Sequence, residues 1–309
     1  MLPKMNDKFA AFIEPASHTS GGLRLAVSLI LMMFFYAVFT VQIIALVALI
    51  EVVQTDLNFS TVFIILITGL ADPNTPRDMM VSLSTFVAIL GAVWITTLIF
   101  RQQSLFALAG SGSVLRNFGT AALAMVPIVV FSFSFSFWLG DARPNLTFGK
   151  WLLWMIPTLP LLLIQSSSEE LIFRGYLLQE FAVRFKSRWI WILIPSIIFG
   201  FLHYDPMRMG SNATLAVVVT IFFGIIATDV TVRTGNLGAA IGLHFMNNFQ
   251  AMLLLSLDGT LNALSLYVTH THVSDEHWVR TMLLFNFGYL TLAYLIYLLV
   301  VRYHDRDLA

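Results

Sequence analysis

Long uninterrupted apolar segments constrain this chain more than any other feature of its sequence. About 20 apolar residues, rising 1.5 Å each in a helix, cross the hydrocarbon core of a bilayer. Eight segments of roughly this kind lie at residues 24–50, 79–100, 117–139, 150–175, 189–204, 213–232, 236–257 and 278–301. The sequence therefore predicts an all-α, polytopic integral membrane protein with about eight transmembrane helices.

The composition supports a membrane protein and excludes several kinds of site. Of the 309 residues, 58% are hydrophobic and only 11% are charged, whereas a soluble domain carries about 25% charged residues. The 17 basic and 17 acidic residues cancel, so net charge indicates neither a nucleic acid nor an acidic partner. The chain has no cysteine, which excludes disulfides, thiolate metal ligands and a cysteine nucleophile.

The apolar segments predict a single membrane-embedded domain, residues 24–301, between two tails. Residues 1–23 lack the apolar core of a cleavable signal peptide and predict a cytoplasmic N-terminal tail. Residues 302–309 predict a C-terminal tail. Lys and Arg are enriched before the first segment and after the even-numbered ones, which predicts an N-in, C-in topology. The apolar stretch 59–70 is too short to span and is expected to be interfacial or re-entrant.

Two adjacent carboxylates near the end of the fourth segment are the most conspicuous ionisable groups within the apolar helices. Such groups are costly in a bilayer and are functional candidates by default. Glu170 and Arg174 have the i, i+4 spacing that favours a helical ion pair. Glu169 points about 100° away from Glu170 and remains free to act as a general base on water. A structural ion pair at a helix end is the alternative interpretation of this dipeptide.

Three further polar side chains lie in later apolar segments, one at the end of 189–204 and two within 236–257. His203 follows Phe199 by four residues, and His244 precedes Asn248 by four. His244 and Asn248 would share one helix face and could stabilise an oxyanion. Alternatively, they form a helix–helix hydrogen bond, and His203 is an interfacial side chain.

A helical hairpin would bring two of these residues to a similar depth in the membrane. Glu169 lies 18 residues before Ser187, in the basic segment expected at the tip, and His203 lies 16 residues after it. The two arms then differ by only about 3 Å in length. Contact between Glu169 and His203 is therefore feasible if both arms are continuous helices.

Together these segments resemble the CAAX prenyl protease family, in its wider grouping with bacterial abortive-infection and bacteriocin-processing membrane proteins. Glu169, Glu170 and Arg174 match its Glu-Glu-x-x-x-Arg motif. Phe199 and His203 match Phe-x-x-x-His, and His244 and Asn248 match His-x-x-x-Asn. The resemblance covers a motif-bearing core at about residues 150–257, and the motifs follow in the family's order.

The resemblance implies an intramembrane, glutamate-dependent endopeptidase that acts on a membrane-associated or lipid-modified protein or peptide. It implies that Glu169 with His203 activates water, that His244 and Asn248 hold the oxyanion, and that Glu170 with Arg174 is structural support. It also implies a mechanism without a cofactor and a multi-pass protein of a prokaryotic inner or cell membrane. The substrate, the cleavage site and the oligomeric state are left open.

Three alternatives remain open from the sequence. Glu169, His203 and His244 could instead bind a catalytic zinc ion, although no His-Glu-x-x-His segment supports this. The chain could also be a non-catalytic scaffold or immunity-type protein that binds partners in the bilayer. Finally, a His-rich cluster could bind a metal at the surface, although a solvated loop is the interpretation we favour for it. This cluster consists of His270, His272, Asp275, Glu276 and His277.

Overall fold

The computed structural model describes residues 6–307, with the side chains of residues 6–302. In this part of the chain, six helices are long and apolar enough to cross a membrane. They are Gly22–Val52, Pro76–Arg101, Val114–Trp138, Phe148–Arg184, Pro206–Thr234 and Glu276–Arg302. The chain is an all-α polytopic membrane protein, as predicted.

The predicted count of eight transmembrane helices is not confirmed, because two of the expected spans are shorter. Helix α9 (Arg188–Phe201) has 14 residues and ends where the chain turns before His203. Helix α12 (Gly238–Asn248) has 11 residues and continues as a π-helix, η3 (Phe249–Leu254). The chain then leaves the helix for a strand, so the apolar segment 236–257 is divided between two kinds of structure.

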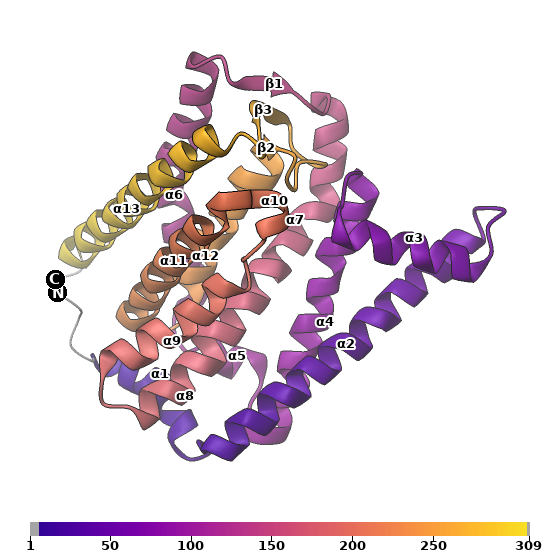
Figure 1. Cartoon of the computed structure of the whole chain (residues 1–309). Helices are drawn as coiled ribbons and strands as arrows, with labels where there is room; N and C mark the ends of the chain where they lie inside the picture. Colours follow the sequence, from indigo (N-terminus) through magenta and orange to yellow (C-terminus); the bar gives the residue numbers. More distant parts are fainter. Residues whose placement is uncertain (1–5, 308–309) are drawn as a thin grey trace.

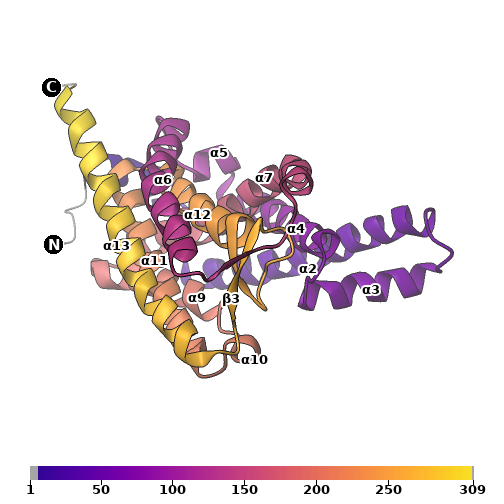
Figure 2. The same cartoon turned by 90° about the horizontal axis from the view of Figure 1, so that it is seen from above.

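Helices α2 (Gly22–Val52) and α4 (Pro76–Arg101) pack side by side, and the short helix α3 (Phe59–Ala71) connects them. Viewed from above, α2 and α3 extend away from the other helices (Figure 2). An ion pair between Glu51 and Arg77 joins the end of α2 to the start of α4. Helix α3 corresponds to the apolar stretch predicted not to span, and it has only 13 residues.

The central helices approach each other closely because small residues lie between them. Helix α6 (Val114–Trp138) packs along α12, and a side chain at Gly238 or Gly242 of α12 would collide with α6. A Cβ atom would lie 2.1 Å from the Val114 carbonyl oxygen at Gly238 and 2.4 Å from the Phe118 oxygen at Gly242. Small residues at helix interfaces are a common device in membranes. Helices α11 (Ala213–Thr234) and α13 (Glu276–Asp307) complete this core (Figure 1).

The segment that carries the two carboxylates is one long, irregular helix. It begins as α7 (Phe148–Glu170), becomes a π-helix, η1 (Leu171–Leu177), and ends as α8 (Leu178–Arg184). Helix α9 returns after residues 185–187, so the hairpin expected at this basic segment is formed. The helix extends beyond the predicted 150–175, because η1 and α8 continue it for another turn or more.

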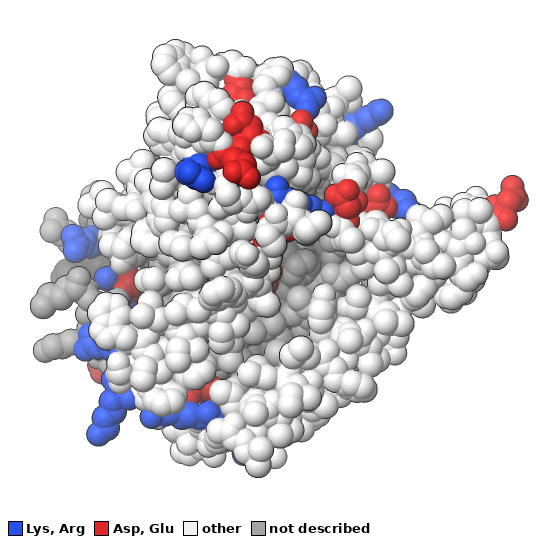
Figure 3. Space-filling model, in the orientation of Figure 1, with Lys and Arg blue, Asp and Glu red and all other residues white. Residues whose placement is uncertain are grey.

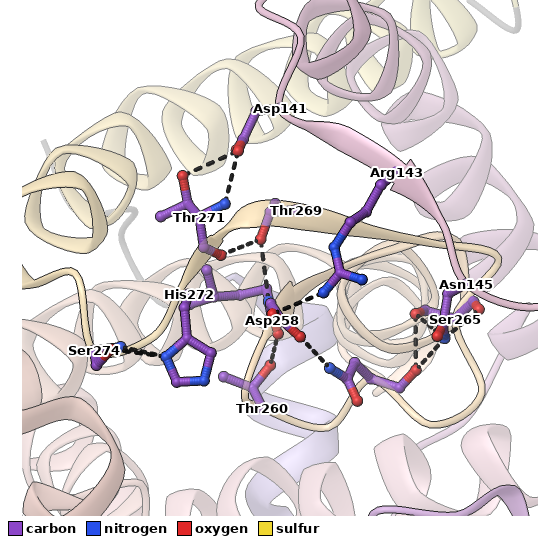
Figure 4. A network of polar contacts seen from close by, with 12 residues as sticks. Asp141, Arg143, Asn145, Asp258, Thr260, Ser265, Thr269, Thr271, His272 and Ser274 are labelled. Atoms are coloured by element: carbon purple, nitrogen blue, oxygen red, sulfur yellow. Dashed lines mark hydrogen bonds and ion pairs between the residues drawn. The ribbon is translucent and has the colours of Figure 1, made fainter.

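A small sheet, not predicted from the sequence, lies at one end of the bundle (Figure 1). Its strands are β1 (Ala142–Pro144), β2 (Leu255–Asp258) and β3 (Tyr267–His272), in the order β1-β3-β2. Strand β3 pairs antiparallel with β1 and parallel with β2. Figure 4 shows the polar network here: Arg143 pairs with Asp258 at 2.8 Å, and Asp141 accepts hydrogen bonds from Thr271. The prediction of a loop around His270 and His272 is therefore wrong, because both residues lie in β3.

Parts of both predicted tails are helical. Helix α1 (Asp7–Ser17) falls within the predicted N-terminal tail, where it buries Phe9 and Phe12 against the bundle. Helix α13 continues to Asp307, into the predicted C-terminal tail. Residues 1–5 and 308–309 of these tails lie outside the described residues. Three short helices complete the chain: α5 (Leu105–Leu108), α10 (Pro206–Met209) and the 3₁₀ turn η2 (Gly210–Asn212).

A buried ion-pair network joins the end of α4 to η1 and α8. The Arg101 side chain is 1% exposed, and its guanidinium lies 2.9 Å from the Glu180 carboxylate, which is 4% exposed. Arg101 also donates to the Tyr176 carbonyl oxygen and to Gln179. Glu180 pairs in addition with Arg184 at 2.7 Å. These contacts hold the α7–α8 segment against α4 at this end of the molecule.

We expect Arg101→Met to destabilise the protein by about 3 kcal/mol, because removing one partner leaves a buried carboxylate with fewer counter-charges. The value lies at the low end for buried pairs since Glu180 retains Arg184. Arg143→Met is the control: Arg143 is 44% exposed, and an exposed pair contributes about 0–1 kcal/mol. Thermal unfolding in detergent measures both, and equal stability of the two variants would contradict this prediction.

Candidate functional site

The two adjacent carboxylates lie where the backbone changes from one helix type to another. Glu170 is the last residue of α7, and η1 begins at the next residue. Asn248 is likewise the last residue of α12, and η3 follows it directly. π-helices are rare and are often found at functional sites. The two segments that carry the predicted site therefore share a local irregularity that the sequence pattern did not show.

Glu170 is completely buried and has two charged or polar partners. Its Oε1 atom lies 3.0 Å from Nη1 of Arg174, whose side chain is also 0% exposed. The ion pair predicted from the i, i+4 spacing is thus formed. The same oxygen lies 2.7 Å from Nδ1 of His244. The Arg174 guanidinium additionally stands 4.7 Å from the centre of the Phe199 ring, a cation–π distance.

Glu169 differs from Glu170 in its exposure and in its partners. Its side chain is 14% exposed, and its Oε2 atom lies 3.4 Å from Nε2 of His244. That oxygen is buried, yet it accepts no hydrogen bond from the described residues. Buried carboxylate oxygens are usually hydrogen-bonded. Glu169 therefore has spare acceptor capacity at a partly accessible position, as a general base requires.

His244 connects the two carboxylates. Its Nδ1 atom faces Glu170 and its Nε2 atom faces Glu169, and the residue is 3% exposed. The acceptor bonded to one ring nitrogen determines which nitrogen carries the proton. Because the Glu170 carboxylate accepts at Nδ1, that nitrogen donates, and Nε2 is directed to the Glu169 side. The rings of Phe199 and Phe223 pack edge-on against His244 at 5.9 and 5.2 Å.

Asn248 is held by a residue that the sequence analysis did not single out. Its Nδ2 atom donates to Oε1 of Gln165 at 2.8 Å, and Gln165 is 6% exposed on α7. The available signal was an amide four residues before Glu169, directly after an apolar run, which places Gln165 and Glu169 on one helix face.

His203 lies just beyond the end of α9 and is more exposed than the other predicted residues. Its Nδ1 atom lies 2.9 Å from the Phe199 carbonyl oxygen and so donates to it. The Phe199 ring packs against both His203, at 4.8 Å, and His244. No hydrogen bond or ion pair joins His203 to Glu169 in the described chain. The structure thus places His244, rather than His203, in direct contact with Glu169.

No group of three His, Cys, Asp or Glu side chains within the described residues is arranged to hold a metal ion. In the alternative zinc set, Glu169 and His244 lie together, but His203 is bonded to the Phe199 backbone instead. The His-rich surface cluster is not a metal group either: His272 bonds to Ser274, and Glu276 bonds to Ser211. The mechanism without a cofactor remains a prediction.

The comparisons with known proteins support the similarity suggested by the three motifs. Residues 149–250 match the type II CAAX prenyl endopeptidase Rce1-like family. This segment runs from the start of α7 into η3 and contains every residue of the predicted site. The match covers about a third of the chain, so the similarity applies to the helices around the carboxylates.

One similar curated protein is the uncharacterized protein YyaK of Bacillus subtilis (strain 168). It is 36% identical over 97 residues, which are 31% of this chain and 32% of that protein. The matched region therefore spans about a third of the relative's length. No solved structure matched the chain.

Substitution of the two carboxylates should affect stability differently. We expect Glu170→Gln to destabilise the protein by about 3–5 kcal/mol, because it leaves the Arg174 charge buried without its counter-ion. Glu169→Gln should cost less than about 1 kcal/mol, since Oε2 of Glu169 accepts no hydrogen bond from the described residues that the amide would lose. Thermal unfolding of both variants in the same detergent tests this, and equal loss of stability would contradict the assigned difference.

Proposed function

We propose that this protein is an intramembrane, glutamate-dependent endopeptidase that cleaves a membrane-associated or lipid-modified protein or peptide. The observation that carries the proposal is the pair of adjacent carboxylates around His244: one is buried and neutralised by Arg174, and the other is partly exposed with spare acceptor capacity. The similarity of residues 149–250 to a family of membrane endopeptidases supports it.

In the proposed reaction, Glu169 is the general base for a water molecule. The carboxylate takes one proton from water, and the resulting hydroxide attacks the carbonyl carbon of the scissile peptide bond. His203 donates to Phe199 through Nδ1, and its Nε2, for which the described residues provide no partner, would accept a hydrogen bond from this water and help to orient it. Collapse of the tetrahedral intermediate breaks the C–N bond, and the proton held by Glu169 passes to the leaving amine.

Because Nδ1 of His244 already donates to Glu170, the ring donates through Nε2 as the imidazolium, and in this form His244, together with Asn248, is a proposed donor to the oxyanion. They lie one turn apart on α12, and each also contacts α7, through Glu169 and Gln165 respectively. Donors held in advance in a low-dielectric site stabilise developing negative charge without reorganising. Glu170 and Arg174 are proposed to act through His244, by holding its ring in place.

A membrane-associated substrate fits the shape of the molecule. Figure 3 shows the surface hollowed between the α2–α4 side and the rest of the bundle, next to α7, the helix that carries Glu169.

Acidic side chains gather near the end that carries the sheet and α10, and basic ones predominate at the opposite end of this face (Figure 3). By the positive-inside tendency, we propose that this basic end is cytoplasmic, with the topology N-in, C-in.

The test is the loss of proteolysis on Glu169→Gln in native membranes. We expect cleavage to fall by about 10²- to 10⁴-fold, the usual contribution of a general base. New peptide termini measured by mass spectrometry, in membranes with wild type and with the variant, report cleavage of whichever membrane protein is the substrate. Glu14→Gln is the matched control, because Glu14 is 65% exposed on α1 and pairs only with His18 among the described residues.

Termini produced by wild type and Glu14→Gln but not by Glu169→Gln would establish the peptidase and identify a substrate. Identical profiles from three folded proteins would contradict it and favour the alternative, a non-catalytic scaffold or immunity-type protein that binds partners in the bilayer.

Metal removal separates the proposed mechanism from the zinc alternative. Because Glu169 and His244 approach each other without His203, we expect cleavage to be unchanged after treatment with a chelator and dialysis. The same termini are quantified before and after treatment. Loss of cleavage that returns on adding zinc would revive a metal-dependent mechanism.

A further inference from the structure

Among the polar contacts that join helices α7 and α12, two lie one helical turn apart. Glu169 of α7 contacts His244 of α12 at 3.4 Å, and Gln165 of α7 accepts from Asn248 of α12 at 2.8 Å. Gln165 lies four residues before Glu169 on α7, and Asn248 lies four residues after His244 on α12, as expected for one face of two antiparallel helices. The Gln165–Asn248 contact therefore repeats the Glu169–His244 contact one turn further along both helices.

We infer that Gln165 is a positioning residue that fixes the Asn248 amide with its nitrogen turned toward the site. This inference rests on the proposed function and deepens it. It assigns a role to a residue outside the three motifs.

The hydrogen bonds around Asn248 determine the orientation of its amide. Gln165 Oε1 is an acceptor, so it requires the nitrogen of Asn248 rather than the oxygen. On the other side, Oδ1 of Asn248 accepts from Nδ2 of Asn247 at 3.2 Å. A rotated amide would set oxygen against oxygen at Gln165 and nitrogen against nitrogen at Asn247. An amide nitrogen has two hydrogens, so Nδ2 can donate to Gln165 and still donate to a developing oxyanion.

Gln165 is itself held in place. Gln165 is 6% exposed, and its Oε1 atom also accepts a hydrogen bond from the Ser166 hydroxyl at 3.2 Å. A buried, doubly bonded acceptor keeps its orientation, because turning it would leave unpaired polar groups in a low-dielectric environment. Gln165 thus supplies a fixed reference for Asn248 from a helix that also carries the proposed base.

The experiment compares Gln165→Met, Asn248→Ala and the double variant with wild type. Methionine keeps the length and apolar stem of glutamine but cannot hold the amide. We expect kcat for the substrate identified above to fall about 10- to 100-fold in Gln165→Met with KM little changed, because misplacement of a transition-state donor costs up to about 10²-fold. In the Asn248→Ala background, Gln165→Met should have an effect of less than about 3-fold, since the residue it positions is gone.

Gln250→Met is the matched control. Gln250 is a partly buried glutamine in η3 that accepts from Tyr289 and donates to Ser132, and it contacts none of the proposed catalytic residues in the described chain. We expect this variant to keep kcat within about 3-fold of wild type. Thermal unfolding of every variant shows whether a substitution lowers stability. If Gln165 had a purely structural role, Gln165→Met would lower the stability of the protein, and its effect on kcat would be the same with and without Asn248.

Each outcome decides one question. An active wild type with an unchanged kcat in Gln165→Met, or an equal loss with and without Asn248, overturns the inference and leaves the peptidase proposal standing. A wild type that produces no termini beyond those of Glu169→Gln overturns the proposed function and this inference with it.

Discussion

A carboxylate with no access to water, at Glu170, is the constraint on which the arrangement of this site depends. A buried charge must be paired and hydrogen-bonded, because its desolvation costs several kcal/mol. Arg174 supplies the counter-charge from the same helix, and His244 supplies a hydrogen bond from α12. Satisfying Glu170 therefore brings α12 against α7 and places the His244 ring between the two glutamates.

The two adjacent glutamates have different roles in our proposal: Glu170 forms a structural ion pair, and Glu169 is the general base. Glu170 is fully buried and pairs with Arg174 through Oε1, whereas the Glu169 side chain is 14% exposed; in each carboxylate, Oε2 accepts no hydrogen bond from the described residues. The Phe199 ring packs beside the two glutamates, where it contacts Arg174, His203 and His244. An aromatic ring here excludes water from the ion pair and so strengthens its electrostatic interactions. Phe199, the apolar residue of the Phe-x-x-x-His motif, thus also has a physical role at the site.

Much of the fold was predictable because the bilayer leaves few choices. Six predicted spans, the hairpin after α8 and the Glu170–Arg174 pair follow from segment length, turn composition and i, i+4 spacing. The short helices α9 and α12, the sheet and the π-helices do not. Strand β3 lies between β2 and β1, and β1 is more than 100 residues away in the chain, so a local sequence pattern does not show this pairing. The resemblance of residues 149–250 to a membrane endopeptidase family was also readable from three spaced motifs.

The sequence by itself determined that this is an all-α membrane protein, and it named Glu169, Glu170, Arg174, His203, His244 and Asn248 as its candidate site. These inferences rest on the cost of polar groups in hydrocarbon, which makes each such residue conspicuous wherever it falls. Only the tertiary structure decided which of them touch. It placed His244 against both carboxylates, set His203 on the Phe199 backbone and added Gln165 as the partner of Asn248. Contacts between helices depend on their rotation and depth, which packing and two π-helical segments set together.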